Sequence, residues 1–345
     1  MLHAVATHLR HGNSSELSRR LPPDLVKILF IDIFGATQNG YLSMKDHTNL
    51  PDTVAVVGLG QMGGSFALAL RFHLPGVRLL GVCPSPDEAA AAVAVGAVDE
   101  ASHRAEDILP RADLTMLAYP IGPLLDFGKA NLHLFKPGSI VTDLSSVKSS
   151  VMTALRQPLL ERGVHFVGSH PMCGTEKTGL NHASPELFRG AVAFVSPEPG
   201  DCPSSTATVS ELWRRLGSRI VVVRSEEHDK ALAYTSHVLH LIANMSTHIA
   251  LEGPFGELAR QACAGSFRDV SRIASANPGM WRNIVAHNSP AVLGALDHTL
   301  DELTMIRQLI AEGRLSELEA YLGQGKRLRD AWFSEYTLAR QESQA

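Results

Sequence analysis

The chain of 345 residues carries 31 Lys and Arg against 35 Asp and Glu, which gives a formal net charge of -4. This balance, without a basic run, excludes the electrostatic surface that nucleic acid or an anionic membrane needs, and it favours a small-molecule partner. With 45% hydrophobic residues the chain can form more than one hydrophobic core, so we expect two domains.

The cysteines and apolar runs bear on the cellular compartment. The four cysteines are widely spaced and include no CxxC pair, so neither a disulfide framework nor a zinc site is indicated. No segment approaches the ~20 apolar residues that cross a bilayer. We expect a cytoplasmic protein without signal peptide, membrane anchor or metal site.

Residues 1–50 show no repeating hydrophobic pattern, and we expect a loosely ordered extension there. Met44 lies just before the first convincing strand. One hypothesis is therefore that the natural protein starts at Met44. Peptides from residues 1–43 in the native protein would contradict it.

From residue 51, short β-branched runs alternate with helical stretches, a pattern typical of a parallel sheet with crossover helices. The sequence predicts strands over residues 53–57, 78–82, 114–118, 139–142, 165–167, 191–195 and 219–223. We therefore predict an α/β Rossmann domain, a doubly wound parallel sheet, over residues 51–224.

After Arg224 the pattern changes to long helical periodicity over residues 229–251, 291–312 and 316–335. These helices predict an all-helical C-terminal domain over residues 225–340. The apolar stripes on the last two helices exceed what one small domain can bury, which predicts a homodimer formed through this dimerisation domain.

The first predicted strand runs directly into a glycine-rich motif, GLGQMGGS, which a predicted helix follows. In this context Gly58 permits a tight turn, Gly60 lets the backbone approach a pyrophosphate, and Gly63 allows close packing of helix on strand. The motif thus predicts a dinucleotide site that includes Gln61 and Met62.

The residue that usually selects the cofactor is missing. The second strand of such a site normally ends in Asp or Glu, which binds the ribose of NAD, but here Cys83 occupies that place. Ser85 offers a donor to a 2'-phosphate, yet the turn contains no Arg. The choice between NAD and NADP stays open, with a slight preference for NADP being usable.

Two polar segments, TDLSSVK over residues 142–148 and the Gly-rich run over residues 168–179, follow predicted strands. The carboxyl ends of parallel strands meet at one edge of the sheet, so Ser146 and His170 should both reach the nicotinamide. The alternative role for Ser146 is as the N-cap of a helix that starts at Val147.

With these motifs the sequence resembles the prephenate/arogenate (cyclohexadienyl) dehydrogenase family over about residues 52–337. The resemblance depends on five segments in the family's order: GLGQMGGS, TDLSSVK, SHPMCGTEKTG, TSHVLHL and GSFRDVSRIASANPGMWRNI. It implies oxidative decarboxylation of prephenate or arogenate to 4-hydroxyphenylpyruvate or tyrosine, with hydride transfer to NAD or NADP.

The resemblance also implies roles for particular residues. His170 would accept the proton of the substrate hydroxyl, and Ser146 would orient both. The residues implied to bind the substrate or close its pocket are Arg272, His240, Thr175 and Glu176, with Trp281 behind them. Leu239 and Asn283 depart from the family, which usually has Pro and Asp there.

Several alternatives accompany this interpretation. Of the histidines on the helical stretch, His228 lies about half a turn from His237, so at most some of them can face one pocket. Either Arg268 or Arg272 is expected to pair with Asp269 or Glu176. A β-hydroxyacid dehydrogenase, whose family also begins with GLGQMG, and a non-catalytic dinucleotide-binding homologue are the competing functions.

Overall fold

The computed structural model describes residues 50–174 and 177–342, all of which fall in one compact unit, Asn49–Ala345. The expected N-terminal extension and the hypothetical start at Met44 lie outside these residues, as do Thr175 and Glu176.

In the described part of the chain, eight strands form one sheet in the order β3-β2-β1-β4-β5-β6-β7-β8. Seven strands were predicted within one or two residues at most ends. The short edge strand β3, which contains Glu100, was not. The strands are β1 Thr53–Val57, β2 Arg78–Val82, β3 Glu100–Ser102, β4 Leu114–Leu117, β5 Ile140–Asp143, β6 His165–Pro171, β7 Val192–Ser196 and β8 Arg219–Val222.

The sheet is not parallel throughout, which corrects the prediction. β7 pairs with β6 in antiparallel fashion, with Phe194 opposite His170, and β8 runs parallel to β7. A parallel neighbour would need a crossover connection, usually a helix. Among its described residues, the link from β6 to β7 has only the 3₁₀ turn η4, Leu180–His182, so β7 returns alongside β6.

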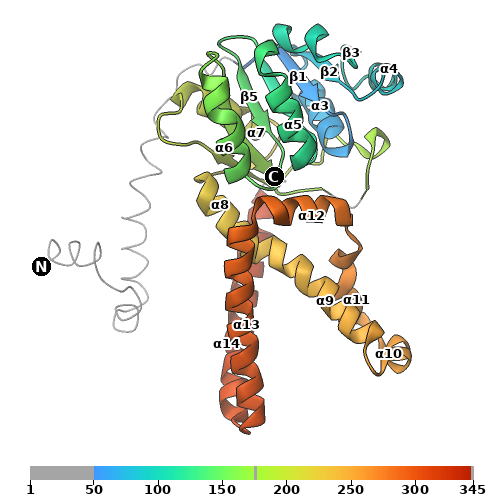
Figure 1. Cartoon of the computed structure of the whole chain (residues 1–345), viewed down its shortest axis with the longest axis vertical. Coiled ribbons are helices and arrows are strands. Elements are labelled where there is room, and N and C mark those ends of the chain that lie inside the picture. Colours follow the sequence, from blue (N-terminus) through green and yellow to red (C-terminus); the bar gives the residue numbers. More distant parts are fainter. Residues whose placement is uncertain (1–49, 175–176, 343–345) are drawn as a thin grey trace, which may run out of the picture. The chain divides into compact units, whose positions relative to one another are not determined.

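Helices cover both faces of the sheet (Figure 1). One hydrophobic cluster joins Val54 and Val56 of β1 to α3 (Gln61–His73) and α7 (Pro203–Arg215). The other joins Ala55 and Val57 to α5 (Ile121–Ala130) and α6 (Ser149–Leu160). The two-sided burial explains why β1 is apolar on both of its faces from Val54 to Val57.

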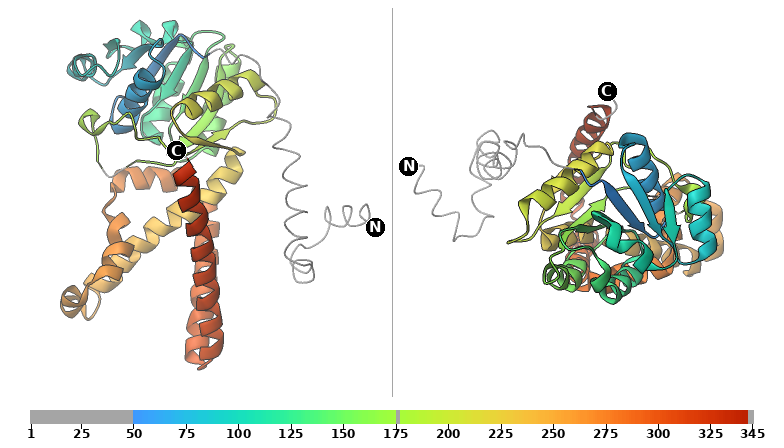
Figure 2. Two further views of the ribbon diagram at one scale, coloured as in Figure 1. Left: turned by 180° about the vertical axis from the view of Figure 1, so that it is seen from behind. Right: turned by 90° about the horizontal axis from the view of Figure 1, so that it is seen from above.

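The region after β8 is helical, as predicted. The expected helix over residues 229–251 is formed by α8, a π-helical turn and α9 in succession. α13 and α14 lie side by side as a hairpin in both figures (Figures 1 and 2). The elements are α8 Ser225–Leu232, the π turn η5 Ala233–His237, α9 Val238–Glu252, α10 Gly256–Ala262, α11 Gly265–Ser271, η6 Arg272–Ser275, α12 Pro278–His287, α13 Ser289–Ala311 and α14 Leu315–Glu342.

The short helices α10, α11 and α12 were not predicted, because segments of 7 to 10 residues offer too few turns for a periodic pattern. None of the helices in the described ranges is long and apolar enough to span a membrane.

Candidate active site

The glycine turn after β1 has the geometry that a phosphate-binding turn requires. Gly58 adopts φ +90°, and a Cβ added at Gly63 would lie 2.0 Å from the carbonyl oxygen of Gly58. Only glycine therefore fits at these two positions. Around Gly60, by contrast, the space for a Cβ is open, so the backbone there is accessible to a ligand.

The helix that follows this turn has an N-terminus without a side-chain cap. Gly60 is the N-cap of α3, and the first turn contains no acidic residue. The N–H groups of a helix N-terminus and the helix dipole favour an anion at this position. Gln61 is buried here, and Met62 packs against the loop at Gly174. These features fit a dinucleotide pyrophosphate.

At the end of β2, Cys83 is buried, and burial together with the charge of Glu88 raises the pKa of its thiol to about 11. Ser85 is the N-cap of α4 (Pro86–Ala94), where its hydroxyl accepts from the Glu88 N–H at 3.2 Å and faces Glu88 Oε1 at 3.4 Å. The Ser85 hydroxyl is thus already engaged with Glu88.

A buried ion pair fixes the segment after β5. Lys148 and Asp143 are fully buried, and the Lys148 ammonium contacts Asp143 Oδ2 directly. Asp143 Oδ1 also accepts from the backbone N–H of Ser169 at 3.1 Å. Because Ser169 precedes His170, this contact ties the end of β6 to the end of β5.

Ser146 is half-buried beside this ion pair. Helix α6 begins at Ser149 with Lys148 as its N-cap, so the alternative role of Ser146 as an N-cap is wrong. The structure records no hydrogen bond between Ser146 and His170. The implied role of Ser146 towards a substrate hydroxyl stays a proposal.

His170 lies near the carboxyl end of β6 and is almost completely buried. Burial, followed by the neighbouring His228, Lys148 and His237, holds the pKa of His170 well below its usual value. The ring is therefore neutral at neutral pH. Its Nδ1 lies 2.9 Å from His228 Nε2, while its Nε2 has no hydrogen-bond partner in the described part of the chain.

His228 in turn contacts the residue that follows it. His228 Nδ1 lies 2.8 Å from Asp229 Oδ1, and both side chains are buried. The Asp229 carboxylate also accepts the backbone N–H groups of Lys148 at 2.7 Å and Ser149 at 2.8 Å. Asp229 of α8 therefore caps the N-terminus of α6.

The π turn brings His237 towards the same buried cluster. Nine residues at ~100° each would put His237 half a turn from His228. A π turn accommodates one extra residue, which reduces the angle between His228 and His237 around the helix axis by ~100°. His237 is fully buried, accepts from Asn288 Nδ2 at 3.0 Å, and burial lowers its pKa to about 4.

His240 and Trp281 form a half-buried wall at the helical side. Their rings stack at 3.7 Å between centroids, and His240 Nδ1 donates to the Ser236 carbonyl at 3.0 Å. Burial lowers the pKa of His240, and the positive charge of Arg272 lowers it further. The fold thus places Arg272 near enough for its charge to act on His240.

The two arginines of this region behave differently. Arg268 forms an exposed ion pair with Asp269 at 3.2 Å, one of the pairings that the sequence allowed. Arg272 is exposed and has no hydrogen bond or ion pair with residues in the described ranges. Its guanidinium is therefore available to a carboxylate.

The two residues that depart from the family pattern lie on α9 and α12. Leu239 is half-exposed, and Asn283 lies next to Gly122 of α5.

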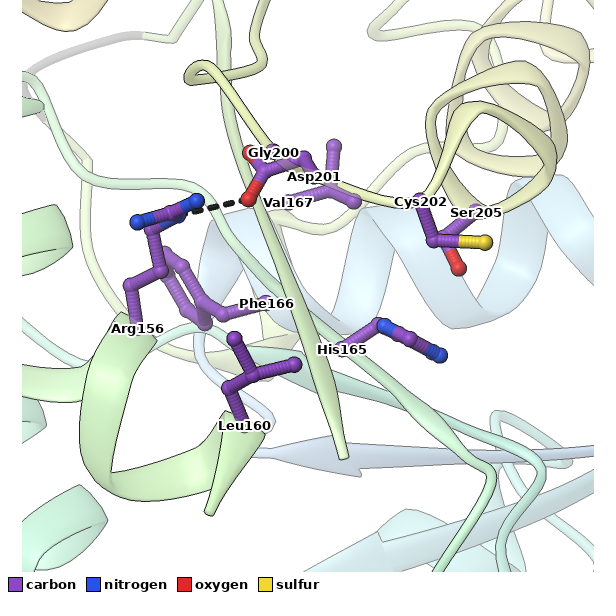
Figure 3. A pocket seen from close by; sticks show the side chains of 9 residues that line it. All are labelled: Arg156, Leu160, His165, Phe166, Val167, Gly200, Asp201, Cys202 and Ser205. Atoms are coloured by element: carbon purple, nitrogen blue, oxygen red, sulfur yellow. Dashed lines mark hydrogen bonds and ion pairs between the residues drawn. The ribbon is translucent and has the colours of Figure 1, made fainter. Parts of the chain in front are cut away.

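A separate cavity lies at the opposite end of β6 (Figure 3). It is lined by His165 at the start of that strand, by Cys202, and by the ion pair of Arg156 with Asp201 at 2.5 Å. The five residue-to-residue steps from His165 to His170 span about 16 Å of strand. This cavity is therefore not the candidate active site.

The glycine turn with its uncapped helix and the neutral His170 at the carboxyl edge define the class. A nucleotide cradle and a proton acceptor at the same edge of the sheet form the arrangement of a nicotinamide-dependent dehydrogenase. In the parts of the chain that the structure describes, no group of three His, Cys, Asp or Glu side chains is arranged to hold a metal ion.

Comparison with known proteins gives the family. Residues 66–222 match the model of the prephenate dehydrogenase nucleotide-binding domain, and residues 224–324 match that of the prephenate dehydrogenase dimerization domain. The chain is 32% identical to the cyclohexadienyl dehydrogenase of Zymomonas mobilis, over 75% of this chain and 88% of that one. It is 30% identical to the prephenate dehydrogenase of Bacillus subtilis, over 81% and 76%.

Two solved structures have the same fold. One is prephenate dehydrogenase from Aquifex aeolicus in complex with hydroxyphenyl propionate and NAD+, with a TM-score of 0.76 and 29% identity over 81% of this chain and 98% of that one. The other is Synechocystis arogenate dehydrogenase, with a TM-score of 0.72 and 29% identity over 81% and 99%.

The chain belongs to the prephenate dehydrogenase family. This confirms the predicted class, an NAD(P)-dependent dehydrogenase whose reaction is an oxidative decarboxylation in tyrosine biosynthesis.

The sequence interpretation did not assign a role to four buried residues of the site. They are the ion pair of the β5 end and the histidine and carboxylate that follow β8: Asp143, Lys148, His228 and Asp229. A signal was present, since His228 and Asp229 are adjacent in the first helix after the last strand. Periodicity alone did not distinguish this pair from ordinary polar residues.

Proposed function

We propose that the chain oxidises and decarboxylates prephenate or arogenate with NAD or NADP as cofactor. One observation carries the proposal. His170 is buried and neutral, its Nε2 has no partner in the described residues, and it lies near the carboxyl end of β6, at the sheet edge that also carries the glycine turn.

The chemistry assigned to His170 follows from the substrate. Prephenate and arogenate carry a ring hydroxyl opposite a ring carboxylate. His170 accepts the hydroxyl proton through Nε2 while a hydride leaves the ring carbon that carries this hydroxyl. When bound, the oxidised nicotinamide takes up that hydride. The C–C bond to the ring carboxylate then breaks, carbon dioxide leaves, and the electron pair completes an aromatic ring, whose oxygen takes the proton back from His170. Formation of the aromatic ring supplies the driving force.

The groups proposed to hold the substrate come from the helical side. Arg272 supplies a positive charge for a substrate carboxylate, and His240, stacked on Trp281, lines the same pocket. Ser146 is proposed to contact the ring hydroxyl. Thr175 and Glu176, which lie outside the described residues, stay proposals from the family resemblance.

The cofactor is proposed to lie on the glycine turn. The residues assigned to it are Gly58, Gly60, Gln61, Met62 and Gly63, with Cys83 and Ser85 at the ribose end. The open space at Gly60 and the uncapped α3 support this assignment.

We further propose a cytoplasmic homodimer with domains over residues 51–224 and 225–340. The match of residues 224–324 to a dimerization domain supports the dimer and the boundary. Four free cysteines are what a reducing compartment favours.

The test is turnover by the purified protein. Prephenate, arogenate and a β-hydroxyacid are each added with NAD or NADP, and the absorbance of the reduced nicotinamide is followed together with release of carbon dioxide. Turnover of a cyclohexadienyl substrate with stoichiometric carbon dioxide supports the proposal. Cofactor reduction with the β-hydroxyacid alone, or cofactor binding without any turnover, would overturn it.

A further inference from the structure

Three buried side chains form a continuous series of hydrogen bonds that ends at the proposed proton acceptor. Asp229 Oδ1 lies 2.8 Å from His228 Nδ1, and His228 Nε2 lies 2.9 Å from His170 Nδ1. His228 has no solvent-exposed surface, and Asp229 is 3% exposed. Water therefore does not compete for these bonds, and each must have one donor and one acceptor.

The direction of the first bond is set by Asp229. Two backbone N–H groups, those of Lys148 and Ser149, donate to its oxygens. Although burial opposes the shift, His228 and these two donors hold the pKa of Asp229 below its usual range, so it is a carboxylate. A carboxylate can only accept. His228 Nδ1 therefore carries the proton.

The direction of the second bond follows from the charge of His228. Burial lowers the pKa of His228, although the Asp229 carboxylate opposes the effect. A neutral histidine with a proton on Nδ1 has a lone pair on Nε2. His228 Nε2 accepts, and His170 Nδ1 donates.

We propose that His228 and Asp229 are positioning residues that hold His170 in the tautomer with its proton on Nδ1, so that Nε2 presents its lone pair to the substrate hydroxyl. This inference depends on the proposed function for the identity of the substrate. It explains why a neutral imidazole is the proton acceptor at one defined atom. The other tautomer would present an N–H to the substrate and could not accept its proton.

The Asp229 carboxylate joins the two proposed domains, so substitution of Asp229 would remove the bond to His228 and the cap of α6 together. Asp229 caps α6, and its backbone carbonyl accepts from Asn288 Nδ2 at 2.9 Å, at the start of α13. Asn288 also contacts His237. A variant at Asn288 removes contacts within the proposed helical domain and leaves the side-chain bonds between His170, His228 and Asp229 intact.

The charged and titratable groups around His170 define what a pH profile reports. They are His228 and Asp229 of α8, Lys148 and Asp143 from the β5 end, and His237 of the π turn. Substitution of His228 removes one of these groups and the hydrogen bond to His170 together, so a changed pH profile would not separate the two effects. The tautomer of His170 is therefore the primary readout.

The first experiment is heteronuclear NMR of wild-type protein labelled at the histidine ring nitrogens, with His170 assigned by comparison with His170→Asn. We expect His170 with Nδ1 protonated and Nε2 unprotonated at neutral pH. A proton on Nε2 would overturn the proposal. This experiment needs no substrate, so it is independent of the proposed function.

The second experiment compares His228→Phe with Asn288→Ala. His228→Phe removes the bond to His170 Nδ1 while a ring still fills the space beside Phe194, which contacts His228 at 5.1 Å between centroids. We expect kcat to fall on the order of 10- to 100-fold, the cost typical of removing the hydrogen-bond partner that orients a metal-binding histidine, with unchanged affinity for the cofactor. Asn288→Ala should lower the melting temperature and keep kcat within about two-fold.

The outcomes separate the two proposals. If the wild type turns over neither cyclohexadienyl substrate, the proposed function fails, and the tautomer result still decides the inference. If the wild type is active and a folded His228→Phe keeps its kcat and its pH profile, the positioning role is wrong. Should His228→Phe fail to fold, the wild-type tautomer remains the deciding measurement.

Discussion

His170 and His228 share a hydrogen bond of 2.9 Å inside the protein, and Lys148 and His237 lie close enough to act on the same ring. All three neighbours, together with burial, disfavour a positive charge on His170. An unperturbed histidine would place the acidic limb of the activity at about pH 6 to 7. The structure moves that limb to lower pH.

His170→Asn tests the proton acceptor. His170 must be unprotonated to act, so wild-type kcat should fall only as the pH drops through a pKa below 6.5. The Asn variant keeps a polar side chain but lacks the base, and kcat should fall by ~100- to 10,000-fold. The measurement is kcat against pH for both proteins. Near-normal turnover, or a retained acidic limb in the variant, would assign the proton to another group.

Arg272→Ala tests the substrate site, with Arg268→Ala as its matched control. Arg268 lies one helical turn earlier, is equally exposed and pairs with Asp269. Loss of a charge-assisted contact to a carboxylate should raise KM for the substrate by about 10- to 100-fold in Arg272→Ala. Binding of the cofactor, measured by fluorescence, should not change. Equal effects of the two substitutions would mean that Arg272 has no special role.

Glu88→Gln tests the cofactor choice. The first turn of α4 places Glu88 beside Ser85, and its charge helps raise the pKa of both Cys83 and Tyr119. Because this charge would repel a 2'-phosphate at the end of β2, we expect NAD to bind more tightly than NADP, although the sequence slightly favoured NADP being usable. Relative affinity for NADPH over NADH should rise about 5-fold in the variant, the effect of ~1 kcal/mol between exposed charges.

Asp87→Asn is the control for this substitution, because Asp87 lies in the same helical turn and carries the same charge. Fluorescence titration with NADH and NADPH measures both variants. An unchanged ratio in Glu88→Gln, or the same rise in Asp87→Asn, would remove Glu88 as the selecting group.

The free energy of unfolding should decrease below neutral pH. His237 has a folded-state pKa of about 4 against about 6.5 when unfolded. Below pH ~6.5 the unfolded chain therefore binds a proton that the buried ring does not, and stability falls until the pH reaches ~4. Urea unfolding between these limits measures the slope.

His237→Asn should reduce that slope. The exposed His248 gives the matched control, because His248→Asn removes a histidine that bonds only Glu252 on the same helix. The control should keep the wild-type slope. A slope that is flat in the wild type would mean that the buried histidines are not neutral.

The helical hairpin predicts a dimer. Helices α13 and α14 carry apolar side chains that are more than half exposed: Leu293, Leu300, Ile310, Leu315, Leu322, Leu328 and Trp332. Light scattering at micromolar concentration should give twice the chain mass. Leu328→Glu should weaken the dimer. The control is Arg327→Glu at the adjacent exposed residue, which changes the charge without removing apolar area. A monomeric wild type would contradict the prediction.

Part of this fold was determined by short segments of sequence. Seven strands and the long helices were predictable because each has its own hydrophobic periodicity. Gly58 and Gly63 were also predictable, since the turn excludes any Cβ there. His170, Arg272 and His240 were predictable from the family motifs. Each of them lies in a short segment with a distinct local composition.

Long-range packing decided the rest. The antiparallel return of β7 depends on what the link after β6 packs against, and the rotation of His237 towards His228 depends on a π turn that no periodic pattern encodes. The pairing of His170 with His228 joins residues 58 positions apart. A hydrogen bond between buried rings exists only once both have left water, so only the tertiary structure could decide which neighbour sets the state of His170.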